Sequence, residues 1–364
     1  MKNKPSALYI HIPFCSHICS YCDFTKLFYN STFSKPYIEA LLKEIDSYNI
    51  DKVDTIYIGG GTPTALSDCE LETILKKVSP FLNKNGEFNV EANVENLTES
   101  KIALLKKYGV NRLSIGIQSS NNELLNKIGR KHTYEDAEKT VKLAQSSGFD
   151  SINVDLIYGF PKQTLNDLKV DLEKILSLGT DHISIYSLIV EPGSIFYNKG
   201  VNEQNEEDSR KFYEYILTTL RKNGYKRYEV SNFAKPGKYS RHNMTYWKNK
   251  EYYGVGLGAS GFVDGIRYQN TRNLDKYVSM NFKDFVEKVD KKNNFEYFLL
   301  TNLRMEDGFQ NIDFINEFGL DAYNELVAKA KTYIEQGLIF VDDNSFKFSD
   351  EGMLIMDHIL VHLI

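Results

Sequence analysis

The sequence predicts an α/β protein: a partial (β/α)6 barrel followed by a smaller C-terminal α+β domain. Six short runs rich in β-branched residues each precede a segment of helical periodicity. The runs are almost continuously apolar, which is typical of parallel strands covered on both faces. After about residue 225 this alternation stops, and the chain ends with the pattern of a strand, a turn, a strand and a helix.

The strands and helices expected in the barrel alternate along residues 1–228. The strands are "ALYIHIP" (7–13), "TIYIGGG" (55–61), "EFNVEAN" (87–93), "RLSIGIQS" (112–119), "INVDLIYG" (152–159) and "HISIYSLIV" (182–190). The helices are expected near 35–48, 67–79, 98–108, 133–147, 164–178 and 206–223. Ser67, Thr98 and Asp150 stand where helix caps or first-turn acceptors are expected. Six successive β/α units favour a wound sheet or a partial barrel.

The second half of the chain is expected to form two further regions. Residues 229–310 connect to the barrel and cover it, and "GVGLGASGFVDG" (254–265) is expected to be a glycine-rich loop. Helices are expected near 294–303, 311–318 and 322–336. Residues 311–364, with a turn at 342–344 between two strands and a final helix, resemble a small winged-helix domain.

Composition excludes several classes of protein. The 44 basic and 49 acidic residues nearly balance, and no basic stripe is visible, which disfavours a winged-helix nucleic-acid binder. No run of 18 apolar residues predicts a transmembrane segment, and the N-terminus lacks the pattern of a signal peptide. Four cysteines without an export signal predict a cytoplasmic protein, in which clustered thiols bind metal or do redox chemistry.

Three of the four cysteines lie in "YIHIPFCSHICSYCDF", at Cys15, Cys19 and Cys22. A structural zinc site needs four ligands, but Cys69 is distant and is expected to be a small buried side chain in a helix. His17 could complete a zinc site as the fourth ligand, but its side chain would be cramped inside the cysteine loop. An iron–sulfur cluster is favoured, because three thiolates on a cubane leave one iron open to a chelating small molecule. Three unrelated cysteines are the remaining alternative.

Polar and glycine residues follow the ends of the expected strands. Glycines in "GGGTP" let the backbone approach a ligand, and Glu91 is placed to accept from ribose hydroxyls. Arg130 is suited to bind a carboxylate bidentately. Each residue alone has a structural alternative, but all are expected near one rim of the barrel: Gly60, Gly61, Thr62, Glu91, Gln118, Arg130 and Asp155.

The C-x3-C-x2-C loop after the first strand, with Tyr21 before the last cysteine, resembles the radical S-adenosylmethionine signature. In that family the amino and carboxylate groups of S-adenosylmethionine chelate the open iron of a 4Fe-4S cluster, and reduction releases a 5′-deoxyadenosyl radical. The resemblance implies that Cys15, Cys19 and Cys22 bind the cluster. It implies S-adenosylmethionine contacts at Tyr9, Tyr21, Gly60, Gly61, Thr62, Glu91, Gln118, Arg130 and Asp155.

The likeness extends over nearly the whole chain. "GGGTPT", "RLSIGIQSSNNELLNKIGRKH" and "NVDLIYGFPKQT" are similar to the oxygen-independent coproporphyrinogen dehydrogenases and their haem-chaperone branch. Three departures favour the chaperone branch. Phe24 replaces a further cysteine, the chain begins only eight residues before Tyr9 where the dehydrogenase has a long extension, and residues 228–262 include "HNMTYW".

The resemblance therefore implies a chaperone that binds haem, a 4Fe-4S cluster and S-adenosylmethionine, and passes haem to an acceptor protein. A reductant protein for the cluster is also implied, and no catalytic residue is assigned. His242 is expected to ligate the haem iron, because imidazole is a common axial donor; a hydrogen-bonded loop histidine is the alternative. His132 is a further candidate to face the site. The competing function is the dehydrogenase itself, which converts two propionates of coproporphyrinogen to vinyls.

Overall fold

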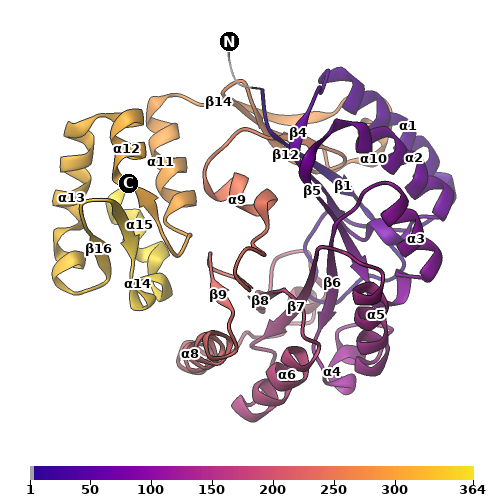
Figure 1. The fold of residues 1–364 in the computed structure, drawn as a ribbon, viewed down its shortest axis with the longest axis horizontal. Coiled ribbons are helices and arrows are strands. Elements are labelled where there is room, and N and C mark those ends of the chain that lie inside the picture. Colours follow the sequence, from indigo (N-terminus) through magenta and orange to yellow (C-terminus); the bar gives the residue numbers. More distant parts are fainter. Residues whose placement is uncertain (1–3) are drawn as a thin grey trace.

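The computed structural model describes residues 4–364, which are built around one nine-stranded sheet (Figure 1). Its central strands are β1 (Ala7–Ile12), β4 (Val53–Gly60), β5 (Leu82–Asn93), β6 (Arg112–Gln118), β7 (Ser151–Tyr158) and β8 (His182–Ser187). These strands are neighbours in that order, and every pair is parallel. Parallel neighbours that follow the chain order require crossover helices, so the predicted barrel of six β/α units is confirmed.

Helices on the outer side of the sheet complete these units (Figure 1). They are α1 (Ser31–Ser47), α2 (Asp68–Val78), α3 (Glu99–Lys107), α4 (Asn122–Lys127), α5 (Tyr134–Ser146), α6 (Leu165–Ser177) and α8 (Glu206–Lys222). Ser67 and Thr98 are N-caps as predicted, and Ser67 forms a capping box with Glu70. The prediction for Asp150 was wrong, because this residue directly precedes β7 and its N–H donates to the Asn111 carbonyl.

Both ends of the sheet contain strands that were not predicted. At one edge β11 (Tyr253–Val255) pairs in parallel with β1. At the other edge β10 (Asn232–Ala234) pairs antiparallel with β8, and β9 (Lys226–Arg227) pairs antiparallel with β10. Part of the expected glycine-rich loop is therefore strand. A Cβ on Gly254 would lie 1.7 Å from the Ser260 carbonyl oxygen, so this glycine permits a close backbone approach.

A smaller sheet follows at the same edge. It consists of β12 (Ser260–Val263), β13 (Ile266–Asn270) and β14 (Lys283–Lys288), all antiparallel, with α10 (Leu274–Val278) inserted before the last strand. The short helices α7 (Ile195–Asn198) and α9 (Arg241–Trp247) complete this part of the chain. Helix α9 contacts both β4 and the following helix α11 (Lys291–Asn302), and Figure 1 shows it between them. None of the described helices has the length and apolar character that crossing a membrane requires.

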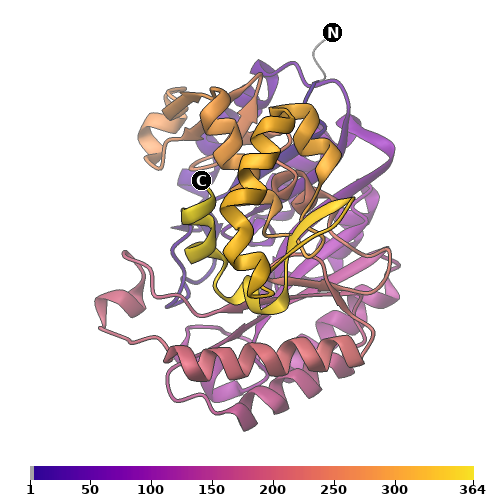
Figure 2. The same ribbon diagram turned by 90° about the vertical axis from the view of Figure 1, so that its left-hand side faces the viewer.

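Residues 291–363 form a C-terminal unit with its own apolar core, in front of the barrel in Figure 2. After α11 it contains β15 (Phe309–Gln310), α12 (Asn311–Phe318), α13 (Leu320–Glu335), β16 (Ile339–Val341), β17 (Ser345–Phe348), α14 (Asp350–Leu354) and α15 (Met356–Leu363). Leu299 and Leu303 of α11 belong to this core together with Phe314 and Phe346. The packing unit thus begins upstream of residue 311.

A buried arginine joins the C-terminal unit to the barrel. Only 1% of the Arg227 side chain on β9 is exposed, and it pairs with Glu306 and, at 2.7 Å, with Asp350. Arg227 also donates to the Tyr213 hydroxyl of α8 at 2.7 Å. A guanidinium is stable in such a place only when its N–H groups are partnered. This network therefore sets the position of the C-terminal unit on the barrel.

We expect Arg227→Met to lower the free energy of unfolding by about 2 kcal/mol, because Glu306 and Asp350 lose their buried partner and keep only the more exposed Arg221. Arg210 is the matched control, since its bonds to Glu214 and Glu351 lie on the surface. Arg210→Met should leave the urea midpoint nearly unchanged. Equal destabilisation by the two substitutions would contradict a special role for the buried arginine.

Candidate functional site

A cavity of about 360 Å³ opens at the carboxyl ends of the barrel strands, and the cysteine loop forms one of its walls. The loop leaves the barrel through β2 (Phe14–Cys15) and returns through β3 (Leu27–Phe28), which pair in parallel. Backbone bonds close it: the Leu27 N–H donates to Pro13 at 2.6 Å, and the Tyr29 N–H donates to Cys15 at 2.9 Å. All three clustered cysteines line the cavity.

The far side of the cysteine loop rests on the turn after α4. The Ser20 N–H donates to the Ile128 carbonyl at 2.9 Å. Gly129 has a φ of +86°, and a Cβ there would lie 3.4 Å from the Ile18 carbonyl oxygen. The αL conformation and the short distance both favour glycine at this position. The motif "IGRKH" thus supports the loop as well as supplying Arg130.

The three thiols surround a space. Burial raises the pKa of Cys15 to about 11 and also raises the pKa of Cys22, so these two thiols hold their protons more strongly than an exposed cysteine does. One zinc ion at about 2.3 Å from each sulfur would bring the thiolates within about 4 Å of one another. Among residues 4–364, no three Cys, His, Asp or Glu side chains gather around a single-ion position. Three thiols on one cavity wall are a donor set that an iron–sulfur cluster can use.

Two polar side chains face the sulfur atoms. The Thr62 hydroxyl lies 3.7 Å from the Cys15 Sγ, and Arg130 Nη1 lies 3.6 Å from the Cys19 Sγ. Such donors stabilise sulfur that carries negative charge. Cys69 contributes nothing here: it is exposed at the start of α2, so the expectation of a buried side chain was wrong.

The end of β4 is shaped by its glycines. Gly60 has a φ of +119°, and a Cβ there would lie 2.9 Å from the His11 ring. A Cβ on Gly61 would lie 2.8 Å from the Cys15 Sγ. The N–H groups of Gly61 and Thr62 donate to Ile12 at 2.8 Å and to Phe14 at 2.9 Å. Glycine is required here so that the backbone can support the cysteine loop directly.

Two carboxyl groups also line the cavity. Glu91 accepts from the Tyr57 hydroxyl at 2.6 Å and from the Gly60 N–H at 3.1 Å. Burial, and then the charge of Asp155, raise the pKa of Glu91 to about 7. Burial also raises the pKa of Asp155, which accepts from the Asn153 amide at 2.7 Å. The pair is suited to accept hydrogen bonds from ligand hydroxyl or ammonium groups.

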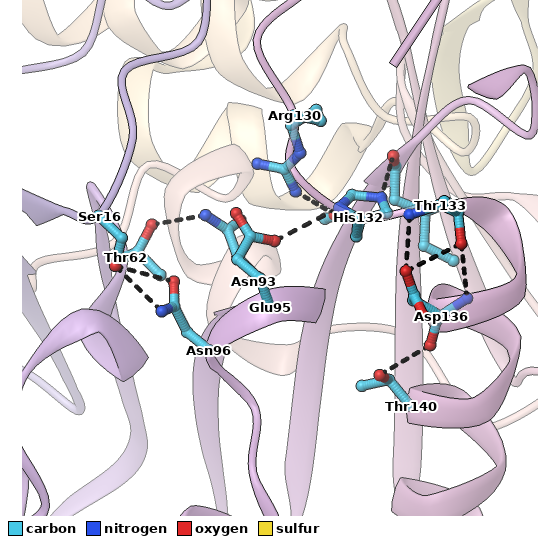
Figure 3. A network of polar contacts seen from close by, with 12 residues as sticks. Ser16, Thr62, Asn93, Glu95, Asn96, Arg130, His132, Thr133, Asp136 and Thr140 are labelled. Atoms are coloured by element: carbon cyan, nitrogen blue, oxygen red, sulfur yellow. Dashed lines mark hydrogen bonds and ion pairs between the residues drawn. The ribbon is translucent and has the colours of Figure 1, made fainter. Parts of the chain in front are cut away.

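Arg130 belongs to the polar network drawn in Figure 3. It donates to the Gly116 carbonyl, and its buried Nε has no partner among the described residues. His132 contacts Glu95 and the Ile117 carbonyl, each at 3.3 Å. Although burial would raise the pKa of Glu95, its hydrogen bond with His132 and the charge of Arg130 lower it to about 2. His132 is thus a buried structural residue and does not line the cavity.

The same network ties the end of β4 to β5, and ties the cysteine loop to the turn that follows β5. The Asn93 amide donates to the Thr62 hydroxyl at 2.9 Å, and the Asn96 amide donates to Ser16 at 3.0 Å (Figure 3). Gln118, at the end of β6, has a φ of +76°, which is uncommon for a residue other than glycine. Residues held in such a conformation cluster at ligand sites.

The structure brings together most of the residues predicted for the site. Cavity-lining side chains and glycines from the predicted set are Cys15, Cys19, Cys22, Tyr21, Gly60, Gly61, Thr62, Glu91, Gln118, Arg130 and Asp155. Tyr9 lines a second, adjoining cavity of about 640 Å³, and its hydroxyl lies 3.0 Å from His11 Nδ1. The two cavities share Phe24, Glu91 and Tyr186 in their walls.

His242 lines neither cavity. It lies on helix α9 with a fully buried side chain, whereas the hydrogen-bonded alternative placed it in a loop. Its Nδ1 is 2.8 Å from the Thr55 hydroxyl, and its Nε2 is 2.7 Å from the Tyr246 hydroxyl. Both ring nitrogens are therefore engaged, as in the hydrogen-bonded alternative that the sequence left open.

Several residues of the two cavities were not predicted. Tyr186 ends the sixth barrel strand and could have been found by the argument used for Gln118. Glu229, Trp247 and Arg272 line the second cavity, and Glu229 Oε1 is buried without a hydrogen-bond partner among the described residues. Trp247 ends the "HNMTYW" element, but no sequence pattern indicates Glu229 or Arg272, because the second cavity is assembled from segments far apart in the chain.

Comparison with known proteins identifies the family. Residues 9–175 match the Radical SAM superfamily, and residues 289–355 match the HemN C-terminal domain. The solved structure of coproporphyrinogen III oxidase (HemN) from Escherichia coli shares the fold, with a TM-score of 0.86 at 21% identity over 99% of this chain and 90% of that chain.

Several curated relatives carry the name "Heme chaperone HemW". The protein from Lactococcus lactis is 42% identical and the alignment covers 97% of this chain and 95% of the relative. The relative from Bacillus subtilis is 37% identical, over 95% of this chain and 96% of the relative. The relative from Escherichia coli is 32% identical, over 99% of this chain and 98% of the relative. The chain therefore belongs to the radical SAM superfamily and, within it, to the family of the haem chaperone HemW.

Proposed function

We propose that this protein is a haem chaperone that carries a 4Fe-4S cluster, binds S-adenosylmethionine and delivers haem to an acceptor protein. The observation that carries the proposal is its likeness, over nearly its whole length, to relatives named as haem chaperones. A reductant protein would supply electrons to the cluster. Clustered free thiols are typical of a reducing compartment, and support a cytoplasmic location.

Cys15, Cys19 and Cys22 would hold the cluster, which when bound supplies an iron open to a chelating ligand. Arg130 and Thr62 would stabilise the negative charge on the cluster sulfurs through the contacts with Cys19 and Cys15. The glycines of β4 keep the loop at the distance that these contacts need. Support for this assignment comes from the donor set and from the space that the thiols surround.

S-adenosylmethionine would bind along the carboxyl ends of β4 to β7. Glu91 and Asp155 would accept hydrogen bonds from its hydroxyl and ammonium groups. The unpartnered Nε of Arg130 offers a donor that remains available to a ligand carboxylate. Tyr21, Gly60, Gly61, Thr62 and Gln118 would complete the walls.

The chaperone function is preferred to coproporphyrinogen oxidation because of Phe24. The dehydrogenase pattern has a cysteine at this position, whereas here an apolar ring, 63% exposed, lines both cavities. An exposed aromatic ring suits contact with a flat apolar ligand and offers no thiol. The cluster and the nucleoside would then order the site or assist haem transfer, without radical chemistry on a substrate.

The cluster assignment predicts that anaerobically reconstituted protein holds about four irons per chain. Cys15→Ser, Cys19→Ser and Cys22→Ser should each lose the cluster, because each removes one of three protein ligands. Cys69→Ser is the control and should keep it, since Cys69 is exposed on α2. Iron and sulfide analysis measures the result. A full cluster in any of the three loop variants, or its loss in the Cys69 variant, would contradict the assignment.

The raised pKa of Glu91 predicts a pH dependence in the protein without cofactors. Between the unfolded pKa of about 4.3 and the folded value of about 7, only the unfolded carboxyl ionises, so stability falls as the pH rises. Wild type should lose on the order of 2 kcal/mol more than Glu91→Gln over this range. Urea unfolding at several pH values tests this, and parallel curves for the two proteins would refute it.

The chaperone assignment predicts that cluster-loaded protein, given reductant and S-adenosylmethionine, forms no protoporphyrinogen from coproporphyrinogen III. It should nevertheless bind haem, seen as a new Soret band on titration. The cluster-free Cys22→Ser variant is the control for any background conversion. Vinyl formation over several turnovers, absent in this control, would instead identify the protein as the dehydrogenase.

A further inference from the structure

Most residues that line the second cavity, of about 640 Å³, have no part in the proposed cluster and S-adenosylmethionine site. Its volume lies in the range of pockets that enclose a small organic ligand. Aromatic side chains are frequent in its wall: Phe24, Tyr57, Tyr186, Tyr246, Trp247 and Tyr252. Rings of this kind offer broad apolar faces, so the cavity suits a flat and largely apolar ligand.

The charged residues of this cavity are unbalanced. Asp23, Glu91 and Glu229 contribute carboxyl groups, whereas Arg272 is the one arginine or lysine among the described residues that line it. His11 adds no positive charge at neutral pH, because burial lowers its pKa to about 4 and the charge of Arg272 acts in the same direction. A carboxylate on a ligand would therefore be attracted to Arg272 and repelled by the ionised acids.

Glu229 makes the part of the cavity next to β10 unsuited to a further negative charge. Its side chain is 1% exposed, its Oε2 accepts from the Ser231 N–H at 3.3 Å, and its Oε1 has no hydrogen-bond partner among residues 4–364. Burial raises the pKa of Glu229 to about 7. A second carboxylate beside it would add like-charge repulsion, which leaves the surroundings of Arg272 as the place for an anionic group.

Arg272 combines a fixed backbone with an available side chain. It lies between β13 and α10, and its exposed side chain forms no hydrogen bond or ion pair with residues 4–364. The residues before it are held firmly: the Thr271 N–H donates to the Phe282 carbonyl at 2.7 Å, and the buried Asn270 amide donates to Glu44 at 2.7 Å. The guanidinium is thus presented from an ordered position, with N–H groups available for bidentate binding of a carboxylate.

We propose that Arg272 binds a propionate of haem and thereby orients the porphyrin in the second cavity. This inference rests on the proposed function, namely that the protein binds haem. Haem combines a flat apolar macrocycle with two carboxylates on one edge, which matches aromatic walls that contain a single cation. The propionate edge then faces the loop after β13, and the macrocycle packs on aromatic rings such as Tyr186 and Trp247. The contact is an ion pair with hydrogen bonds, and no covalent bond is made or broken.

The test compares haem with its dimethyl ester, in which both propionates are uncharged, by titration of the cluster-loaded protein. We expect Arg272→Gln to bind haem at least about fivefold more weakly than wild type, because the carboxylate loses a charge-assisted bidentate partner. The ester should bind the two proteins equally, since it offers no carboxylate. Arg272→Lys should recover part of the affinity for haem, because it restores the charge without the planar fork.

Lys276→Gln is the matched control. It removes one positive charge from α10, close to Arg272 in the chain, but Lys276 pairs with Asp284 and lines neither cavity. Its affinities for haem and for the ester should equal those of wild type. Iron and sulfide analysis of each variant comes first, so that affinities are compared at equal cluster content.

Equal weakening of haem and ester in Arg272→Gln would overturn the inference, because it would indicate a disturbed cavity and not a lost carboxylate contact. Unchanged haem affinity in this variant would overturn it as well. Lys26 lines the cysteine-loop cavity and not the second one, so a loss specific to haem in Lys26→Gln, with Arg272→Gln unaffected, would place the propionate there instead.

The wild-type protein separates the inference from the function on which it rests. If it binds haem and the ester with equal affinity, the propionate contact is refuted and the chaperone proposal stands. If it binds neither porphyrin, the proposed function itself is refuted.

Discussion

The packing of the cysteine loop on the glycine-rich end of β4 determines where every other part of the site can lie. Gly61 and Thr62 donate backbone hydrogen bonds to Ile12 and Phe14, at 2.8 and 2.9 Å, just before the first thiol. A side chain on Gly61 would meet the Cys15 sulfur at 2.8 Å. The distance between the two segments thus fixes the thiols relative to the strand ends, and with them the depth of the cavity.

Charge in the cavity follows from this arrangement. Arg130 lies 3.6 Å from the Cys19 sulfur, and the carboxyl groups of Glu91 and Asp155 line the same cavity. Burial raises the pKa of both carboxyl groups, because it disfavours their charged forms. A ligand that donates hydrogen bonds to the carboxyl groups and presents a carboxylate to Arg130 would complement these charges.

The C-terminal unit is positioned by a different kind of interaction. Arg227 links β9 with Glu306 and Asp350, while α9 packs between β4 and α11. Polar contacts in a buried junction are directional, so they define one orientation where apolar packing alone would permit several. The wall of the second cavity that contains Glu229 and Asn243 therefore depends on the same junction.

Local sequence determined the six barrel strands, the helix caps at Ser67 and Thr98 and the gathering of the rim residues. An apolar run forms a strand, and Ser67 or Thr98 caps a helix, through interactions within a few residues of the chain. Neighbouring parallel strands then bring their carboxyl ends to the same edge of the sheet. The spacing of the three cysteines likewise determined that they share one loop. Only the tertiary structure decided that Cys69 is exposed, that Gly254 lies in a strand contact, and that both nitrogens of His242 are engaged. These properties depend on partners such as Thr55, 187 residues away from His242, and no local pattern encodes which distant side chain will occupy a hydrogen-bonding position.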